Sequence, residues 1–67
     1  MKIALSNYPQ LKLIAWNRSA EDFVSDWEAL ALYERNWDLV DKESLEDKER
    51  QLIEHLTKTV GNGVFHV

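Results

Sequence analysis

One stretch of the sequence combines a helical period with a clear stop signal. Gly61-Asn62-Gly63 ends it, and glycine adopts the left-handed conformation that closes a helix without steric cost. The stretch opens at Ser44-Leu-Glu-Asp47, which has the spacing of an N-terminal cap. Between these signals the apolar residues recur at helical spacing: Leu45, Leu52, Ile53, Leu56 and Val60. The pattern predicts a long amphipathic helix over residues 44–60, which needs a neighbour to cover its apolar face.

Two further helices are predicted upstream. Ser25-Asp-Trp-Glu28 has the form of a capping box, in which the serine and glutamate side chains each satisfy a free N–H. It opens a helix over residues 25–37. Pro9 suits the first turn of a helix, because that turn needs no N–H donor, so residues 9–16 are predicted as a short helix. The same segment also fits the alternation of a strand, through Leu11, Leu13 and Ala15.

Both ends of the chain carry short apolar segments bounded by turn signals. Residues 2–5 precede Ser-Asn-Tyr-Pro, and residues 64–67 follow Gly61-Asn62-Gly63. Each segment is predicted as a short strand, paired with the other or added to the sheet edge of a partner. A two-stranded ribbon is marginal in water, so the alternative is a tail packed loosely on the helices.

The length of 67 residues predicts a single compact domain over residues 1–67. Folding at this size buries only about 60% of the surface of the open chain. The sequence contains no cysteine, so neither a disulfide nor a cysteine-bound zinc can add stability. We therefore expect a mainly α, three-helix domain that depends on tight packing, oligomerisation or a partner.

The net charge of −4 is distributed unevenly along the chain. Residues 1–20 carry +3, residues 21–49 carry −8 and residues 50–67 carry +1. Binding to nucleic acid is disfavoured, because no cluster of lysine and arginine is present to neutralise phosphates. The acidic middle either favours a basic surface on another protein or only keeps the helix surfaces solvated.

A cytoplasmic location is expected from the apolar runs. The run after Lys2 has only three residues, Ile3-Ala4-Leu5, whereas a secretory signal needs about 7–15. No run approaches the roughly 20 apolar residues of a membrane span, and no membrane partner is expected.

Two glutamates fall on the apolar faces of predicted helices: Glu34 within residues 25–37 and Glu49 within residues 44–60. Burying a carboxylate is costly unless the group is paired or hydrogen-bonded. Arginine side chains, indole N–H groups or the free N–H groups at a helix start are the expected partners, which makes both glutamates structural. The functional alternative is a carboxylate pair that acts as acid and base or holds a metal.

No other arrangement of residues indicates catalysis, a cofactor or a metal. His55 and His66 match no zinc-binding spacing. The serines are explained as helix caps, and no G-x-S-x-G motif is present. Gly61-Asn62-Gly63 follows a helix, whereas a phosphate-binding loop precedes one. We expect no enzymatic activity, no cofactor and no metal.

The segment from Trp27 to Trp37 is the richest in large side chains. In helical projection one broad face, the expected core face, carries Trp27, Leu30, Ala31, Tyr33 and Trp37. Leu32 lies on the opposite side, so the helix is expected to contact neighbours on two sides. Either another part of this chain covers Leu32 or a second molecule does.

The end of the same helix is a candidate recognition patch. Tyr33-Glu34-Arg35-Asn36-Trp37 combines, within about one turn, the three residue types that dominate binding hot spots. The predicted partner-binding residues are Leu32, Tyr33, Arg35 and Trp37. In the alternative, the tyrosine and the tryptophan belong to the core and the arginine pairs with a nearby acid.

These features favour a non-enzymatic interaction protein, such as an inhibitor, an antitoxin-like neutraliser or an adaptor. Its partner is expected to be another protein or a second copy of itself. The alternative is a small dimeric transcriptional regulator with a helix-turn-helix. A recognition helix needs basic residues at its start, yet Asp41-Lys-Glu-Ser-Leu-Glu-Asp47 is mostly acidic. A carboxylate-dependent hydrolase using Glu34 and Glu49 is a remote third class.

Overall fold

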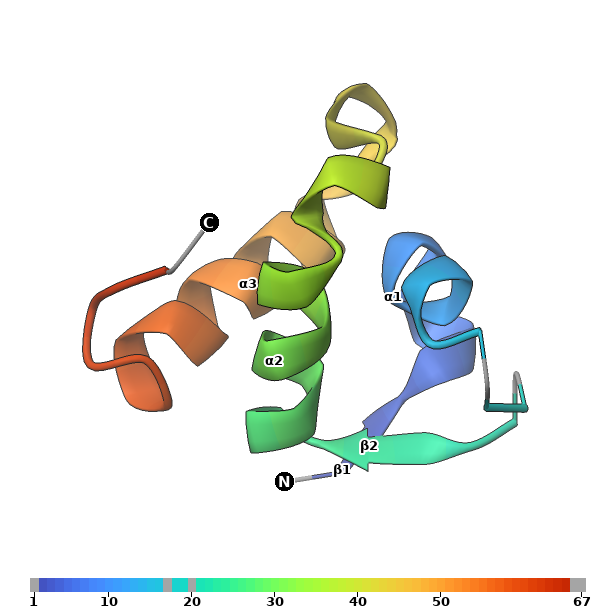
Figure 1. The fold of residues 1–67 in the computed structure, drawn as a ribbon, viewed down its shortest axis with the longest axis horizontal. Helices are drawn as coiled ribbons and strands as arrows, with labels where there is room; N and C mark the ends of the chain where they lie inside the picture. The colour runs from blue at the N-terminus through green and yellow to red at the C-terminus, as the bar shows by residue number, and fades with distance from the viewer. Residues whose placement is uncertain (1, 17, 20, 66–67) are drawn as a thin grey trace.

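The computed structural model describes residues 2–16, 18–19 and 21–65. Three α-helices and a two-stranded antiparallel sheet make up this part of the chain (Figure 1), which confirms the predicted fold class. The main elements are, in order, β1 (Lys2–Ala4), α1 (Pro9–Ile14), β2 (Phe23–Ser25), α2 (Asp26–Arg35) and α3 (Asp47–Thr59). Three short 3-10 turns complete the order: η1 (Leu5–Asn7), η2 (Trp37–Leu39) and η3 (Lys42–Ser44).

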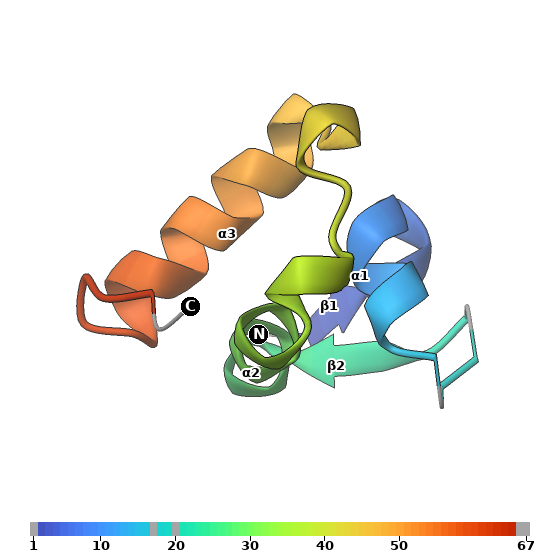
Figure 2. The ribbon, with the colours of Figure 1, turned by 45° about the horizontal axis from the view of Figure 1, so that its top comes forward.

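Helix α2 is the element against which the others pack. It contacts α3, α1 and, near its N-terminal end, the sheet (Figures 1 and 2). The core that these contacts enclose consists of Ile3, Leu5, Leu11, Ile14, Ala15, Val24, Ala29, Leu30, Tyr33, Val40, Leu52, Ile53 and Leu56. Because α1 and α3 cover two sides of α2, its third side is left facing away from the core.

The predicted start of the second helix is confirmed. Ser25 is the N-cap of α2, and its hydroxyl accepts a hydrogen bond from the Glu28 N–H at 3.1 Å. The helix ends at Arg35, two residues before the predicted boundary, and the Asn36 side chain donates to the Leu32 carbonyl at 2.9 Å. Trp37 therefore begins the separate turn η2 and is not part of the helix.

The long helix begins later than the capping pattern predicts. Ser44 lies in η3, and its hydroxyl donates to the Asp41 carboxylate at 2.8 Å, so it does not cap α3. Glu46 is the N-cap residue, and its carbonyl accepts from the Glu49 and Arg50 N–H groups at 3.0 Å. A local hydrogen bond between two side chains has thus replaced the expected cap.

The sheet joins the N-terminal strand to a segment that the sequence pattern does not identify as a strand. Ile3 pairs with Val24, and both side chains are buried. The predicted strand over residues 2–5 is confirmed as Lys2–Ala4, but its partner is Phe23–Ser25. The predicted strand over residues 64–67 is wrong for Val64 and Phe65, which have no strand conformation; residues 66 and 67 lie outside the described residues.

The stop signal after α3 is confirmed, and it explains why residues 64 and 65 form no strand. Asn62 and Gly63 adopt positive φ angles of 54° and 86°. The Gly63 N–H donates back to the Thr57 carbonyl at 2.8 Å, so the chain reverses direction. This reversal carries the Phe65 ring to an edge-to-face contact with Trp37, with centroids 4.9 Å apart.

Gly61 is expected to tolerate alanine poorly. A Cβ at this position would lie 2.5 Å from the Val64 carbonyl oxygen and 2.9 Å from that of Thr57. We expect Gly61→Ala to lower the free energy of unfolding by about 1–3 kcal/mol, because backbone atoms must shift. Gly63→Ala, where a Cβ meets nothing within 4 Å, is expected to cost only the left-handed strain, about 1 kcal/mol. Urea unfolding followed by circular dichroism measures the free energy of unfolding of both variants. The prediction is contradicted if Gly61→Ala loses less stability than Gly63→Ala.

Candidate functional site

Glu49 is the charged residue at the centre of the fold. Its side chain has no exposed surface. The carboxylate accepts hydrogen bonds from the backbone N–H groups of Gln10 at 3.2 Å and Leu11 at 2.8 Å. It also accepts from the Tyr33 hydroxyl at 2.6 Å. Since Gln10 and Leu11 are in the first turn of α1, the glutamate from α3 caps that helix, and the predicted structural partner at a helix start is confirmed.

Tyr33 belongs to the same buried cluster. Its side chain is fully buried. Burial, and next the hydrogen bond to Glu49, raise the pKa of Tyr33 well above its ordinary value. The prediction that Tyr33 contacts a partner is therefore wrong for this structure, because its ring and hydroxyl are both used inside the core.

Gln10 is a polar core residue that sequence reasoning missed. Its side-chain oxygen accepts a hydrogen bond from the Asp41 N–H at 3.0 Å. This bond ties the connection between α2 and α3 to α1, beside the cap formed by Glu49. A glutamine in the first turn of a short helix gives no sequence signal for such a role.

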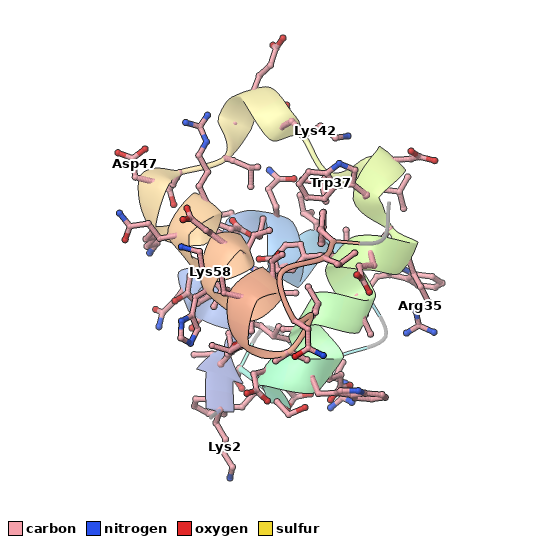
Figure 3. All side chains as sticks on the ribbon, turned by 90° about the vertical axis from the view of Figure 1, so that its left-hand side faces the viewer. Lys2, Arg35, Trp37, Lys42, Asp47 and Lys58 are labelled. Carbon is pink, nitrogen blue, oxygen red and sulfur yellow. The ribbon has the colours of Figure 1, made fainter. Side chains whose placement is uncertain are left out.

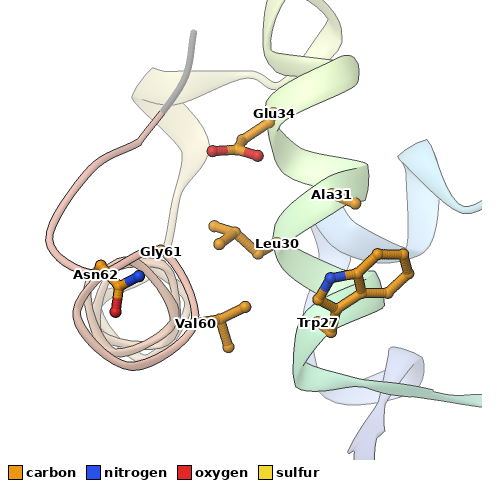
Figure 4. A pocket seen from close by; sticks show the side chains of 7 residues that line it. All are labelled: Trp27, Leu30, Ala31, Glu34, Val60, Gly61 and Asn62. Atoms are coloured by element: carbon orange, nitrogen blue, oxygen red, sulfur yellow. The ribbon is translucent and has the colours of Figure 1, made fainter.

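Glu34 does not join Glu49 in a site. It lines a surface groove of about 350 Å³ between α2 and the end of α3 (Figure 4). In that groove Leu30 from α2 and Val60 from the end of α3 point toward each other. A substrate that reaches Glu34 does not reach Glu49, which is fully buried. The arrangement therefore gives the carboxylate-pair alternative no support.

The side of α2 that faces away from the core is the strongest candidate for a binding surface. We call it the outer face of α2 and define it by Trp27, Glu28, Ala31, Leu32 and Arg35. Trp27 was expected on the core face, yet it is 69% exposed. The core side of α2 is occupied by Ala29, Leu30 and Tyr33, and Trp27 lies on another side of the helix.

A hollow of about 250 Å³ lies beside the outer face, where α1 meets the second half of α2. Its walls are formed by Ile14, Trp16, Leu32, Arg35 and Asn36. Trp16 is 77% exposed, and sequence reasoning did not single it out. Leu32 is half-buried against the core, so α1 covers it only in part.

Arg35 separates this hollow from a second one of about 200 Å³, which is lined by Glu34, Arg35, Trp37 and Asp38. The arginine projects outward from α2 (Figure 3). It forms no ion pair with any residue that the structure describes. The alternative in which Arg35 pairs with a nearby acid is not seen among the described residues, and the Glu28 carboxylate is bound by Arg18 instead.

Trp37 has a mainly structural position. Its ring contacts Phe65, and the Lys42 ammonium lies 5.1 Å from the ring centroid while donating to the Trp37 carbonyl at 2.8 Å. Of the four predicted partner-binding residues, Leu32 and Arg35 thus line one surface hollow, and Trp37 lies at the edge of the next. Tyr33 lies beneath them in the core.

The arrangement of the described residues gives no support to a metal site, a helix-turn-helix or a membrane span. They contain no group of three or more His, Asp or Glu side chains placed to hold a metal ion. Residues 36–46 separate α2 from α3, a longer connection than the 3–4-residue turn of a helix-turn-helix. Within the described part of the chain, no helix has the length and apolar character needed to cross a bilayer.

Comparisons with protein-family models, with curated proteins and with solved structures found no match to this chain.

Proposed function

We propose that this protein is a non-enzymatic protein–protein interaction module that binds through the outer face of α2. One observation carries the proposal: Arg35, which has no ionic partner in the described part of the chain, shares a hollow with the highly exposed Trp16 and a helix face with the highly exposed Trp27. Each indole offers on the order of 150–250 Å² of mainly apolar area. Tryptophan and arginine are also the residues most enriched in binding hot spots.

The chemistry of this surface supports recognition of a protein. Leu32 and Ile14 contribute apolar side chains to the lining of the hollow, and Arg35 contributes N–H donors. Such a surface fits an apolar side chain that stands next to a carboxylate or a carbonyl group. An inhibitor, an antitoxin-like neutraliser or an adaptor uses a surface of this kind without catalytic groups, and the cysteine-free composition supports a role in the cytoplasm.

Capture experiments with surface variants test the proposal. The immobilised protein is incubated with native lysate, and the retained proteins are compared with those retained by Arg35→Glu and Trp16→Ala. We expect both variants to lose at least about 90% of a specifically retained protein, as hot-spot substitutions do. Binding of an added untagged copy is measured in the same way.

Matched controls come from exposed residues outside the proposed surface. Lys12→Glu reverses one charge on α1, and Leu39→Ala removes an apolar side chain that is 68% exposed. Both controls are expected to retain the partner. The proposed function is contradicted if a protein is retained equally by all four variants. It is also contradicted if the wild type retains neither a lysate protein nor the added copy.

A further inference from the structure

The turn after α3 contains an asparagine followed directly by a glycine, Asn62-Gly63. Asn62 is exposed where it lines the groove of Figure 4, and its side-chain amide has no hydrogen-bond partner among the residues that the structure describes. Gly63 is exposed too, and a Cβ there would meet nothing within 4 Å. The Asn62 amide is therefore free to rotate, and no side chain on the next residue shields the Gly63 nitrogen.

An asparagine in this setting can react with the backbone of the residue that follows it. The Gly63 nitrogen loses its proton to a base in the solvent and attacks Asn62 Cγ, so a new C–N bond closes a cyclic imide. The Cγ–Nδ2 bond breaks, and the nitrogen leaves as ammonia after it takes a proton from water. Water then opens the imide at either carbonyl and gives aspartate or isoaspartate. The net change consumes one amide and water and yields a carboxylate and ammonium, so the reaction needs no oxidant or reductant.

One hydrogen bond of the folded turn opposes this reaction. The Gly63 N–H donates to the Thr57 carbonyl at 2.8 Å, so the proton that must leave is held by an acceptor in α3. The closed turn also fixes Asn62 at a φ of 54°. Attack therefore requires the turn to open, and the fraying of a helix end is a local event that costs much less free energy than unfolding of the domain.

We propose that Asn62-Gly63 is a site of spontaneous deamidation, and that the hydrogen bond from Gly63 to Thr57 controls its rate. The proposal goes beyond the proposed function and does not depend on it. The turn opens and closes much faster than the amide reacts, so the rate follows the fraction of molecules in which the turn is open.

The products are expected to loosen the turn that held the reaction back. A carboxylate at residue 62 stands at the negative end of the α3 dipole, which repels it. Isoaspartate also adds a methylene group to the main chain, and this disrupts the spacing that the Gly63–Thr57 hydrogen bond requires. Modification is thus expected to release the end of α3 and the contact of Phe65 with Trp37.

Peptide mapping by mass spectrometry tests the proposal after long incubation of the full chain in mildly alkaline buffer. Cleavage after lysine and arginine places the four asparagines, residues 7, 17, 36 and 62, in four different peptides. The first three precede large side chains, which hinder the attacking nitrogen, and serve as internal controls. In guanidinium chloride Asn62 is expected to react at least about tenfold faster than any of them, and in the folded protein at least about tenfold more slowly than in denaturant.

Variants separate the turn from the stability of the whole domain. The Cβ of Gly61→Ala would lie 2.9 Å from the Thr57 carbonyl oxygen, which must shift, so the folded variant is expected to deamidate at least about fivefold faster. Val24→Ala weakens the buried side of β2 and leaves the turn intact, and it is expected to react at nearly the wild-type rate. Gly63→Ala is expected to slow the reaction in denaturant at least about tenfold, because its methyl group hinders the nitrogen.

Hydrogen exchange of the Gly63 N–H in the wild type gives a second measurement that needs no variant. The slowing of deamidation by folding is expected to match the protection of this N–H, even if Gly61→Ala does not fold. The isoaspartate form, separated by its extra charge, is expected to unfold at a lower urea concentration than the unmodified protein.

Four results overturn the proposal. Asn62 that reacts no faster in denaturant than the other asparagines overturns the site. Equal rates in the folded and denatured protein, or equal acceleration by Gly61→Ala and Val24→Ala, overturn the control by the turn. An isoaspartate form as stable as the unmodified protein overturns the loosening of α3.

Discussion

Replacing Glu49 with alanine is expected to lower the free energy of unfolding by roughly 3–5 kcal/mol. The substitution removes the acceptor of three hydrogen bonds, from the N–H groups of Gln10 and Leu11 and from the Tyr33 hydroxyl. Glu49 is completely enclosed, so water does not replace the lost acceptor. A domain of this length has a total stability of roughly 3–10 kcal/mol, and the variant is therefore expected to be largely unfolded.

Urea unfolding followed by circular dichroism measures the loss. Glu54→Ala is the matched control, because Glu54 is exposed on α3 and its ion pair within the described residues is with Lys58 at 3.0 Å. Removing an exposed pair of this kind costs about 0–1 kcal/mol. Glu49→Gln keeps one acceptor oxygen and the shape of the side chain, so an intermediate loss of about 1–3 kcal/mol is expected. If Glu49→Ala is as stable as Glu54→Ala, the buried cap does not contribute as described.

Above pH 10 the protein is expected to lose stability that its Tyr33→Phe variant does not lose. The pKa of Tyr33 is raised above its ordinary value of 10.0 by burial and by the hydrogen bond to Glu49. At a pH between the ordinary pKa, which applies to the unfolded chain, and the raised pKa of the folded state, the folded protein keeps the phenol proton and the unfolded chain releases it. The unfolded state then binds fewer protons, so stability falls as pH rises, by about 1.4 kcal/mol per pH unit from this one group. Below the unfolded pKa both states keep the proton, and Tyr33 adds no pH dependence.

The comparison with phenylalanine isolates this contribution, since all other titrating groups are common to both proteins. Urea unfolding is measured for both in steps from about pH 8 to pH 11.5, across the ordinary tyrosine pKa. At the lower end Tyr33→Phe is expected to be less stable by about 1–2 kcal/mol, because Glu49 loses a donor. The difference in the free energy of unfolding between the wild type and Tyr33→Phe is expected to shrink above pH 10. A difference that stays constant across the range contradicts the raised pKa.

The features that were predicted correctly depend on neighbouring residues. The Ser25 cap, the proline in the first turn of α1 and the glycine stop after α3 each act within one helical turn. Local rules of this kind need no knowledge of the fold. Ser44 shows their limit, because the nearby Asp41 accepts its hydroxyl and removes it from the cap.

The features that were missed depend on residues far apart in the chain. Strand β2 has three residues, too few for a visible alternation, and it exists because β1 lies beside it. Trp27 fits the apolar period of its helix but is 69% exposed, so period alone cannot tell a core residue from a surface one. The costly burial of Glu49 was correctly anticipated, but which helix start satisfies it depends on the packing of α1 against α3.

The cap of α1 has a consequence for the way the chain is made. Its two hydrogen bonds join residues 39 and 38 positions apart, so the first helix has no acceptor for its free N–H groups until residue 49 has left the ribosome. A helix of six residues is too short to be stable alone. The N-terminal half is therefore expected to have no stable fold of its own during synthesis, and α1 is expected to form only once α3 is available to pack against it.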